Sequence, residues 1–176
     1  MKDVIWPGGA VMSPPGDGGP SGPAALLSPE QLLAAIAGHL EDDSPLIGWA
    51  RELGDLHAVL LPGWASPRSR PADFDDAGVR REIADTIEQI NSWAVFHLPR
   101  PDGARRHTHC LGEVISHIAM TYAAAIWTIR HSDDEQQRHE AMFHLAEVRE
   151  GYADLLVEIH ARRVQLPLGW RGARTP

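Results

Sequence analysis

The chain has 176 residues and a formal net charge of −8, with 16 Lys and Arg against 24 Asp and Glu. This length suits one domain with a buried core. The acidic balance argues against a general nucleic-acid or membrane-surface binder, because both partners require a basic protein field. Lys2 is the only lysine and stands in a Gly- and Pro-rich stretch, which argues strongly against Schiff-base and P-loop chemistry.

The cysteine content indicates the type of cellular compartment in which the protein is expected. Cys110 is the only cysteine, so an intrachain disulfide and a Cys-based structural zinc site are excluded, and a reducing compartment fits. No segment has the ~18 consecutive apolar residues of a membrane span. Residues 1–11 lack the basic start and apolar run of a signal peptide. We therefore expect a cytoplasmic protein.

Glycine and proline gather near the N-terminus and suggest the domain organisation. Residues 1–28 contain 6 of the 16 glycines and 5 of the 14 prolines, and such a stretch sustains neither a helix nor a central strand. We expect a flexible tail over residues 1–27, a single helical domain over residues 28–167 and a short tail over residues 168–176.

Helix start signals divide this domain into segments. Ser28-Pro29 places an N-cap before a proline at the first helical position, Asp43-Ser44-Pro45 starts a second helix, and Thr108 is expected to cap the fourth. The predicted helices cover residues 28–40, 43–61, 75–98, 108–130 and 132–164. No alternating pattern predicts a strand, so the sequence predicts an all-α bundle of about five helices.

The fourth predicted helix is the most informative. It is apolar on two sides, which indicates a central helix, and its residues His109, Glu113 and His117 recur every four positions. We therefore expect these side chains to point into the bundle. Imidazole beside a carboxylate is typical of general acid–base catalysis, so His109 and His117 are the predicted base and acid, and Glu113 orients one of them. The alternatives are purely structural hydrogen bonds and a mononuclear His/Glu metal site.

The residues before this helix predict an anion site. Arg105, Arg106 and His107 precede the helix N-terminus, where free N–H groups and the helix dipole favour a carboxylate or phosphate. The alternative is a solvated linker. Trp127 is a candidate for contacting a planar ligand, although its helical spacing favours core packing.

Four further side chains have simple interpretations. Cys110 is either a nucleophile activated by the helix N-terminus or a small buried hydrophobe. His97 is expected in the core or as a C-terminal cap. His57 and His39 are expected at the surface.

One segment and four flanking stretches carry a family resemblance. The segment is His107-Thr108-His109-Cys110-Leu111-Gly112-Glu113-Val114-Ile115-Ser116-His117-Ile118. The flanking stretches are Ile90-Asn91-Ser92-Trp93, Leu145-Ala146-Glu147, Tyr152-Ala153-Asp154-Leu155 and Arg163-Val164-Gln165-Leu166-Pro167. Together, over residues 77–167, they resemble a bacterial helical family, the domain of unknown function 4254. The resemblance implies an all-α fold and no assigned activity. The chain departs from the family at His109, where Glu is usual, and at Ser116-His117, where Asp-Arg is usual.

These residues favour an enzymatic function. We expect a small bacterial enzyme that performs metal-independent acid–base chemistry, of isomerase, lyase or cyclase type, on a small anionic or planar metabolite without a cofactor. One alternative is a non-catalytic helical interaction or ligand-binding module that uses the N-terminal tail and the arginine-rich end from Arg162 to Arg174. The second is a mononuclear His/Glu metalloprotein. No nucleic-acid or membrane partner is expected. A homo-oligomer is compatible with the sequence. A cavity of ~300 Å³ or more along the histidine stripe would favour the enzyme over the interaction module.

Overall fold

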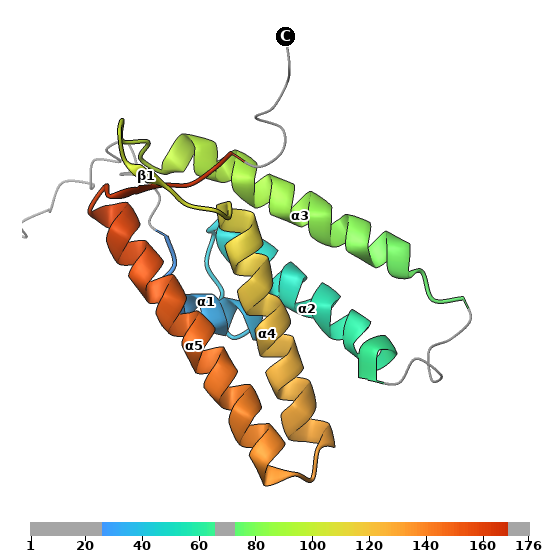
Figure 1. Cartoon of the computed structure of the whole chain (residues 1–176). Helices are drawn as coiled ribbons and strands as arrows, with labels where there is room; N and C mark the ends of the chain where they lie inside the picture. Colours follow the sequence, from blue (N-terminus) through green and yellow to red (C-terminus); the bar gives the residue numbers. More distant parts are fainter. Residues whose placement is uncertain (1–25, 66–72, 169–176) are drawn as a thin grey trace, which may run out of the picture.

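The computed structural model describes residues 26–65 and 73–168, so almost all of both predicted tails lies outside the described residues. Within these residues the chain forms five helices, which confirms the predicted all-α bundle (Figure 1). The helices are α1 (Pro29–Ile36), α2 (Pro45–Ala65), α3 (Asp76–His97), α4 (Leu111–His131) and α5 (Glu135–His160). None of them is long and apolar enough to cross a membrane.

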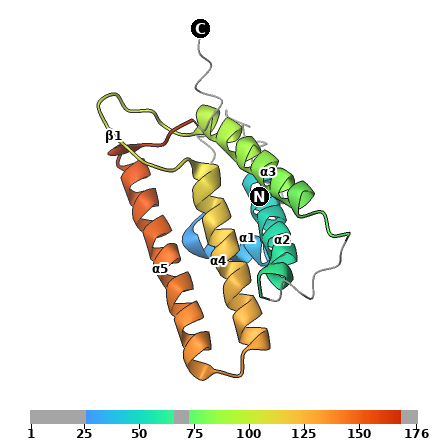
Figure 2. The same ribbon diagram turned by 45° about the vertical axis from the view of Figure 1, so that its right-hand side comes forward.

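Helix α4 lies at the centre of the bundle, as predicted. It contacts all four other helices, with α5 antiparallel along one side and α2 and α3 on the other (Figures 1 and 2). Its side chains Leu111, Ile115 and Ile118 are buried in the main hydrophobic core, together with Leu53 and Leu60 of α2. This packing explains why the helix carries apolar residues on more than one side.

A close backbone approach joins α3 to α4 near the start of α4. The buried Asn91 side chain accepts a hydrogen bond through Oδ1 from the Gly112 N–H at 2.9 Å. A Cβ atom at Gly112 would lie 2.4 Å from the Ile87 carbonyl oxygen of α3. Only glycine therefore fits at this crossing.

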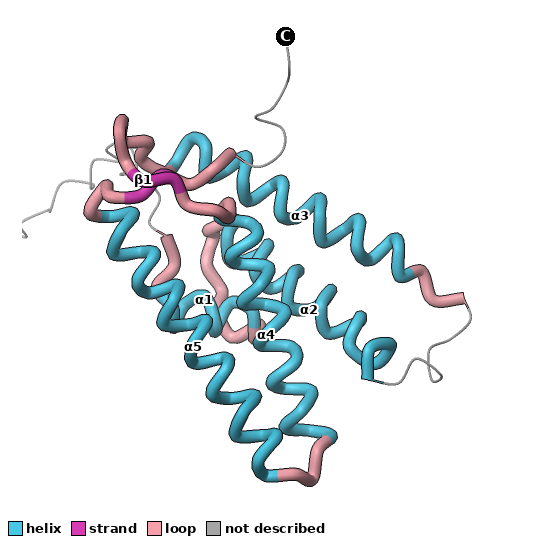
Figure 3. Tube along the Cα trace, in the orientation of Figure 1, coloured by secondary structure: helices cyan, strands magenta, loops and turns pink. Residues whose placement is uncertain are grey.

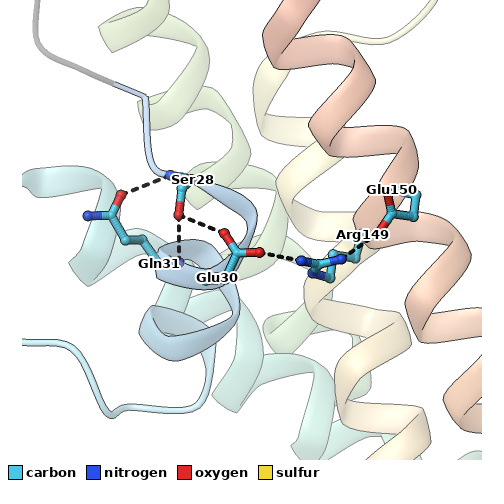
Figure 4. A network of polar contacts seen from close by, with 5 residues as sticks. All are labelled: Ser28, Glu30, Gln31, Arg149 and Glu150. Carbon is cyan, nitrogen blue, oxygen red and sulfur yellow. Dashed lines mark hydrogen bonds and ion pairs between the residues drawn. The ribbon is translucent and has the colours of Figure 1, made fainter.

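The start of α1 is tied to α5 by a polar network (Figure 4). Ser28, the predicted N-cap, forms a capping box with Gln31. Ser28 Oγ accepts from the Gln31 N–H at 3.2 Å, and Gln31 Oε1 accepts from the Ser28 N–H at 2.9 Å. Glu30 pairs with Arg149 of α5, which also pairs with Glu150. The eight-residue α1, too short to be stable alone, thereby gains contacts with a distant helix.

Three predicted helix ends are wrong. α1 stops at Ile36 rather than residue 40, because Gly38 adopts a φ of +74° and ends the helix. α5 stops at His160 rather than residue 164, and Arg162 has a φ of +55°. α2 continues past Pro62 to Ala65 instead of stopping at residue 61. Leu60 and Leu61, the two residues before this proline, are buried.

The start of α4 also differs, because a short strand pair precedes it. β1 (Arg105–Arg106) pairs in parallel with β2 (Val164–Gln165), and the N-cap is Cys110 rather than Thr108. Figure 3 shows this pair at one end of the bundle. Two-residue strands leave no alternating pattern in a sequence, so none was predicted. The pair fixes the loop that leads into α4.

Candidate functional site

A depression of about 650 Å³ follows the first half of α4. We call it the histidine groove. Its polar lining residues are His57, His107, His109, Glu113, Ser116 and His117. Its apolar lining residues are Ile87, Val114, Ile118, Met120, Val148, Gly151, Tyr152 and Leu155. The groove therefore contains the three predicted catalytic residues, with walls drawn from α2, α3, α4, α5 and the loop before α4.

The predicted trio lies at the surface of this groove. The side chains of His109 and Glu113 are 65% and 42% exposed, and His117 is exposed. The expectation that they point into the bundle is therefore wrong. The polar stripe of α4 faces outward, and it is the residues on the two flanks of this stripe that pack against the neighbouring helices.

Glu113 links the start of α4 to His109. Its Oε2 accepts a hydrogen bond from the Cys110 backbone N–H at 3.0 Å and lies 3.6 Å from His109 Nδ1. Partial burial acts to raise the pKa of Glu113, but the Cys110 hydrogen bond and His109 outweigh it, so the pKa is lowered. Glu113 is therefore an ionised helix cap that also lies beside an imidazole.

His107 extends the polar end of the groove. It is half-buried, and its Nδ1 lies 2.8 Å from the His109 carbonyl oxygen. The two imidazole rings lie edge to face with centroids 6.1 Å apart. The His107 N–H donates to the Gln165 carbonyl at 2.9 Å, which extends the β1–β2 pairing by one bond. The strand pair thus positions His107 over the start of α4.

Sequence reasoning missed two residues of the groove, His57 and Ser116. His57 is only 8% exposed, so its expected surface position is wrong. Its Nε2 lies 2.9 Å from Ser116 Oγ, whereas its buried Nδ1 has no hydrogen-bond partner within the described residues. Burial, followed by the charges of Arg80 and His117, lowers the pKa of His57 to about 4. A neutral imidazole–hydroxyl pair therefore forms part of the groove wall at pH 7.

A sequence signal for His57 does exist. It follows the buried Leu53 by four positions and precedes the buried Leu60 by three, which places it on the core-facing stripe of α2. Ser116 carried only the weaker signal of its departure from the resembled family.

The predicted substrate-binding arginines lie outside the groove. Arg105 and Arg106 are exposed on β1, and Arg105 Nη2 lies 2.7 Å from Glu158 Oε2 of α5. Two of the backbone N–H groups at the start of α4, where the sequence predicts an anion site, already donate hydrogen bonds to side chains. Cys110 N–H donates to Glu113 and Gly112 N–H donates to Asn91.

Trp127 and Cys110 are also placed away from the predicted chemistry. Trp127 lies near the end of α4, where its ring stacks on His131 at a centroid distance of 3.8 Å, and it does not line the groove. Cys110 is 2% exposed, and burial raises the pKa of its thiol. The expectation that the helix N-terminus favours its thiolate is therefore wrong, and the small buried hydrophobe is the interpretation that fits.

Within residues 26–65 and 73–168, no three His, Cys, Asp or Glu side chains gather in a way that could hold a metal ion. No family model, curated protein or solved structure matches the chain. The resemblance to the domain of unknown function 4254 stays a prediction.

Proposed function

We propose that this protein is a small-molecule enzyme that performs metal-independent proton transfer in the histidine groove. The observation that carries the proposal is that several acid–base groups, His107, His109, Glu113 and His117, line the same depression. Its volume of about 650 Å³ falls in the range that suits a small ligand. Imidazoles and a carboxylate sit at its mouth, and aliphatic side chains line its sides.

The exposed imidazoles are assigned to proton transfer. His117 lies in the second turn of α4, whereas His109 stands in the loop two residues before the helix begins at Leu111. Both line the groove, so they can reach different parts of one metabolite-sized substrate. Glu113 Oε2 lies 3.6 Å from His109 Nδ1 and orients that ring. We assign His109 as the base and His117 as the acid.

The rest of the groove is assigned to binding. The neutral His57–Ser116 pair suits an uncharged polar group such as a carbonyl or hydroxyl, because a charged group would lose its hydration beside buried side chains. Ile87, Val114 and Met120 suit the planar or apolar part of the substrate. Arg106 does not line the groove, but it is exposed one residue before His107, which does. It is the arginine that we assign to an anionic group extending beyond the groove.

Gly151 of α5 offers a direct test of the groove. It lines the depression, and no heavy atom lies within 4 Å of a Cβ added there. Gly151→Leu would extend a larger side chain from this open position into the groove, whereas Gly151→Ala is the matched control. A panel of small anionic and planar metabolites is screened by ligand-observed NMR against all three proteins. We expect ligands that bind the wild type and Gly151→Ala to bind Gly151→Leu at least about tenfold more weakly, as loss of groove contacts implies.

Turnover then separates an enzyme from a binding protein. Bound compounds are incubated with protein treated with a chelator, and products are identified by NMR. We expect conversion that falls by about 10²-fold or more in His117→Gln and is unchanged in His139→Gln, an exposed histidine of α5. Ligands that bind Gly151→Leu as well as the wild type, or that bind the groove but are never converted, would contradict the proposal.

The second candidate function is a non-catalytic interaction module. It is favoured by large apolar side chains that the fold leaves exposed. They are Val59, Phe96, Ile129, Met142, Phe143 and Val157. Binding of a macromolecule without any groove ligand would favour this function over the enzyme.

A further inference from the structure

A second depression, of about 540 Å³, lies between α2 and α3 and shares no lining residue with the histidine groove. Its lining includes three aromatic side chains, Trp49, Trp93 and Phe96, and two carboxylates, Asp85 and Glu88. No Lys, Arg or His contributes to it among the described residues. We call it the aromatic depression. Its combination of aromatic faces and acids is independent of the proposed enzymatic function.

Two of the three aromatic side chains are held in place, and the third is almost fully exposed. Trp49 Nε1–H donates to Gln89 Oε1 at 3.0 Å, which fixes the indole of α2 against α3. Trp93 is buried and stacks on His97 with a centroid distance of 4.3 Å and an interplanar angle of 7°. Phe96 is 85% exposed, more than any other large apolar side chain of the described chain. Nothing in the bundle accounts for this exposure.

The acids and aromatics occupy two ends of one stripe. Asp85, Glu88, Ser92 and Phe96 follow one another at helical spacing along α3, over roughly 16 Å at 1.5 Å per residue. The carboxylates stand at the N-terminal end and Phe96 at the C-terminal end, with Trp49 alongside. A surface of this length accepts several residues of a peptide rather than a single small ion.

We propose that the aromatic depression is a docking surface for a basic peptide segment of a partner protein. An arginine or lysine side chain of the partner would lie over Trp49 with its charge towards Asp85. An aliphatic side chain nearby in the partner would cover Phe96. Charge complementarity supports this occupant, because the aromatic faces and the Asp85 carboxylate both attract a cation. An acidic partner would meet repulsion at the same place.

The test uses the full chain and two fluorescein-labelled eight-residue peptides. One peptide carries two arginines and one leucine among glycines, and the other carries citrulline in place of both arginines. Citrulline keeps the shape of arginine and removes its charge. Fluorescence anisotropy measures affinity, and the indole N–H signals of Trp49 and Trp93 in ¹⁵N NMR spectra report the place of binding.

We expect the arginine peptide to bind and to shift the Trp49 signal, and the citrulline peptide to bind about fivefold more weakly or worse, as a lost cation–π contact and ion pair imply. Phe96→Ala and Asp85→Asn should each weaken binding by a similar factor. Phe96 touches little of the core, so its replacement leaves the fold intact. Val157→Ala, at an exposed apolar position of α5, is the control and should change nothing.

Three results would overturn the proposal. The first is equal binding of the two peptides, and the second is equal weakening by Phe96→Ala and Val157→Ala. The third concerns this chain's own basic end, which contains Arg171 and Arg174. If the peptide binds only the Arg171→Gln/Arg174→Gln variant, the surface serves the chain itself and not a partner.

Discussion

His57 shows how one buried residue couples the groove to the stability of the fold. Its ring is 8% exposed, one nitrogen faces Ser116 Oγ at 2.9 Å, and the other is buried without a partner among the described residues. Removing Ser116 would leave both nitrogens unpaired, and an unsatisfied buried polar group costs about 1–3 kcal/mol. The pair is therefore a structural element of the groove wall as well as a candidate for ligand contact.

Titration of His57 predicts acid sensitivity. Its pKa is about 4 in the folded chain and ordinarily near 6.5 when exposed. Between pH 4 and pH 6.5 the unfolded chain therefore binds more protons at His57 than the folded chain does. The contribution of the neutral His57 to the free energy of unfolding is complete above pH 6.5 and is lost as the pH falls towards 4. The difference corresponds to about 3 kcal/mol. Urea unfolding at pH 7 and at pH 4 should show a loss of that order in the wild type that His57→Gln lacks. His39→Gln, at an exposed position, should retain the full loss, and parallel profiles for the wild type and His57→Gln would contradict the prediction.

Among the helices, the crossing of α3 and α4 depends on a single glycine. Gly112→Ala would push a Cβ to 2.4 Å from the Ile87 carbonyl oxygen and 3.0 Å from Asn91 Oδ1. Overpacking of this kind costs about 1–3 kcal/mol, so we expect the free energy of unfolding to fall by that amount. Gly48→Ala is the control, because a Cβ at Gly48 of α2 meets nothing within 4 Å and alanine in a helix gains about 0.5–1 kcal/mol over glycine. Chemical denaturation measures the free energy of unfolding of both variants. Equal changes of the same sign in the two variants would show that the α3 and α4 backbones are not in tight contact at Gly112.

The ends of helices could be predicted from the sequence where the pattern that sets them lies within a few neighbouring residues. The Ser28 capping box and the start of α3 at Asp75, which accepts from the Gly78 N–H at 2.8 Å, are local patterns that a sequence displays. The end of α5 depends on the β1–β2 pairing, which joins residues distant in the chain. No short window of sequence contains that information.

The same difference between local and long-range information decides which residues of the histidine groove could be predicted. His109, Glu113 and His117 were predicted as one stripe because a helix fixes their relative positions, and all three line the groove. Their direction, outward rather than inward, depends on how α5, α2 and α3 pack around α4. His57 joins them only because α2 crosses α4, and so its role required the tertiary structure.

At the scale of the whole molecule, α1 is secured to α5 by one buried and one exposed contact. Tyr152 Oη–H donates to the Leu27 carbonyl at 2.9 Å and is buried, and burial raises the pKa of this tyrosine. The Glu30–Arg149 ion pair next to it is solvent-exposed (Figure 4). Both contacts join segments more than a hundred residues apart in the sequence. The docking of α1 therefore depends on the completion of the fold at α5.

The two contacts should differ in their effect on stability. Tyr152→Phe leaves the Leu27 carbonyl without its donor, which costs about 1–3 kcal/mol, whereas Arg149→Ala removes an exposed pair worth about 0–1 kcal/mol. Because an eight-residue helix is unstable alone, we expect Tyr152→Phe to speed amide hydrogen exchange in α1 more than in α4. Arg149→Ala should change exchange in α1 less, and its effect should shrink further at high salt. If Arg149→Ala released α1 as fully as Tyr152→Phe does, the exposed network rather than the buried hydroxyl would be what holds the first helix in the bundle.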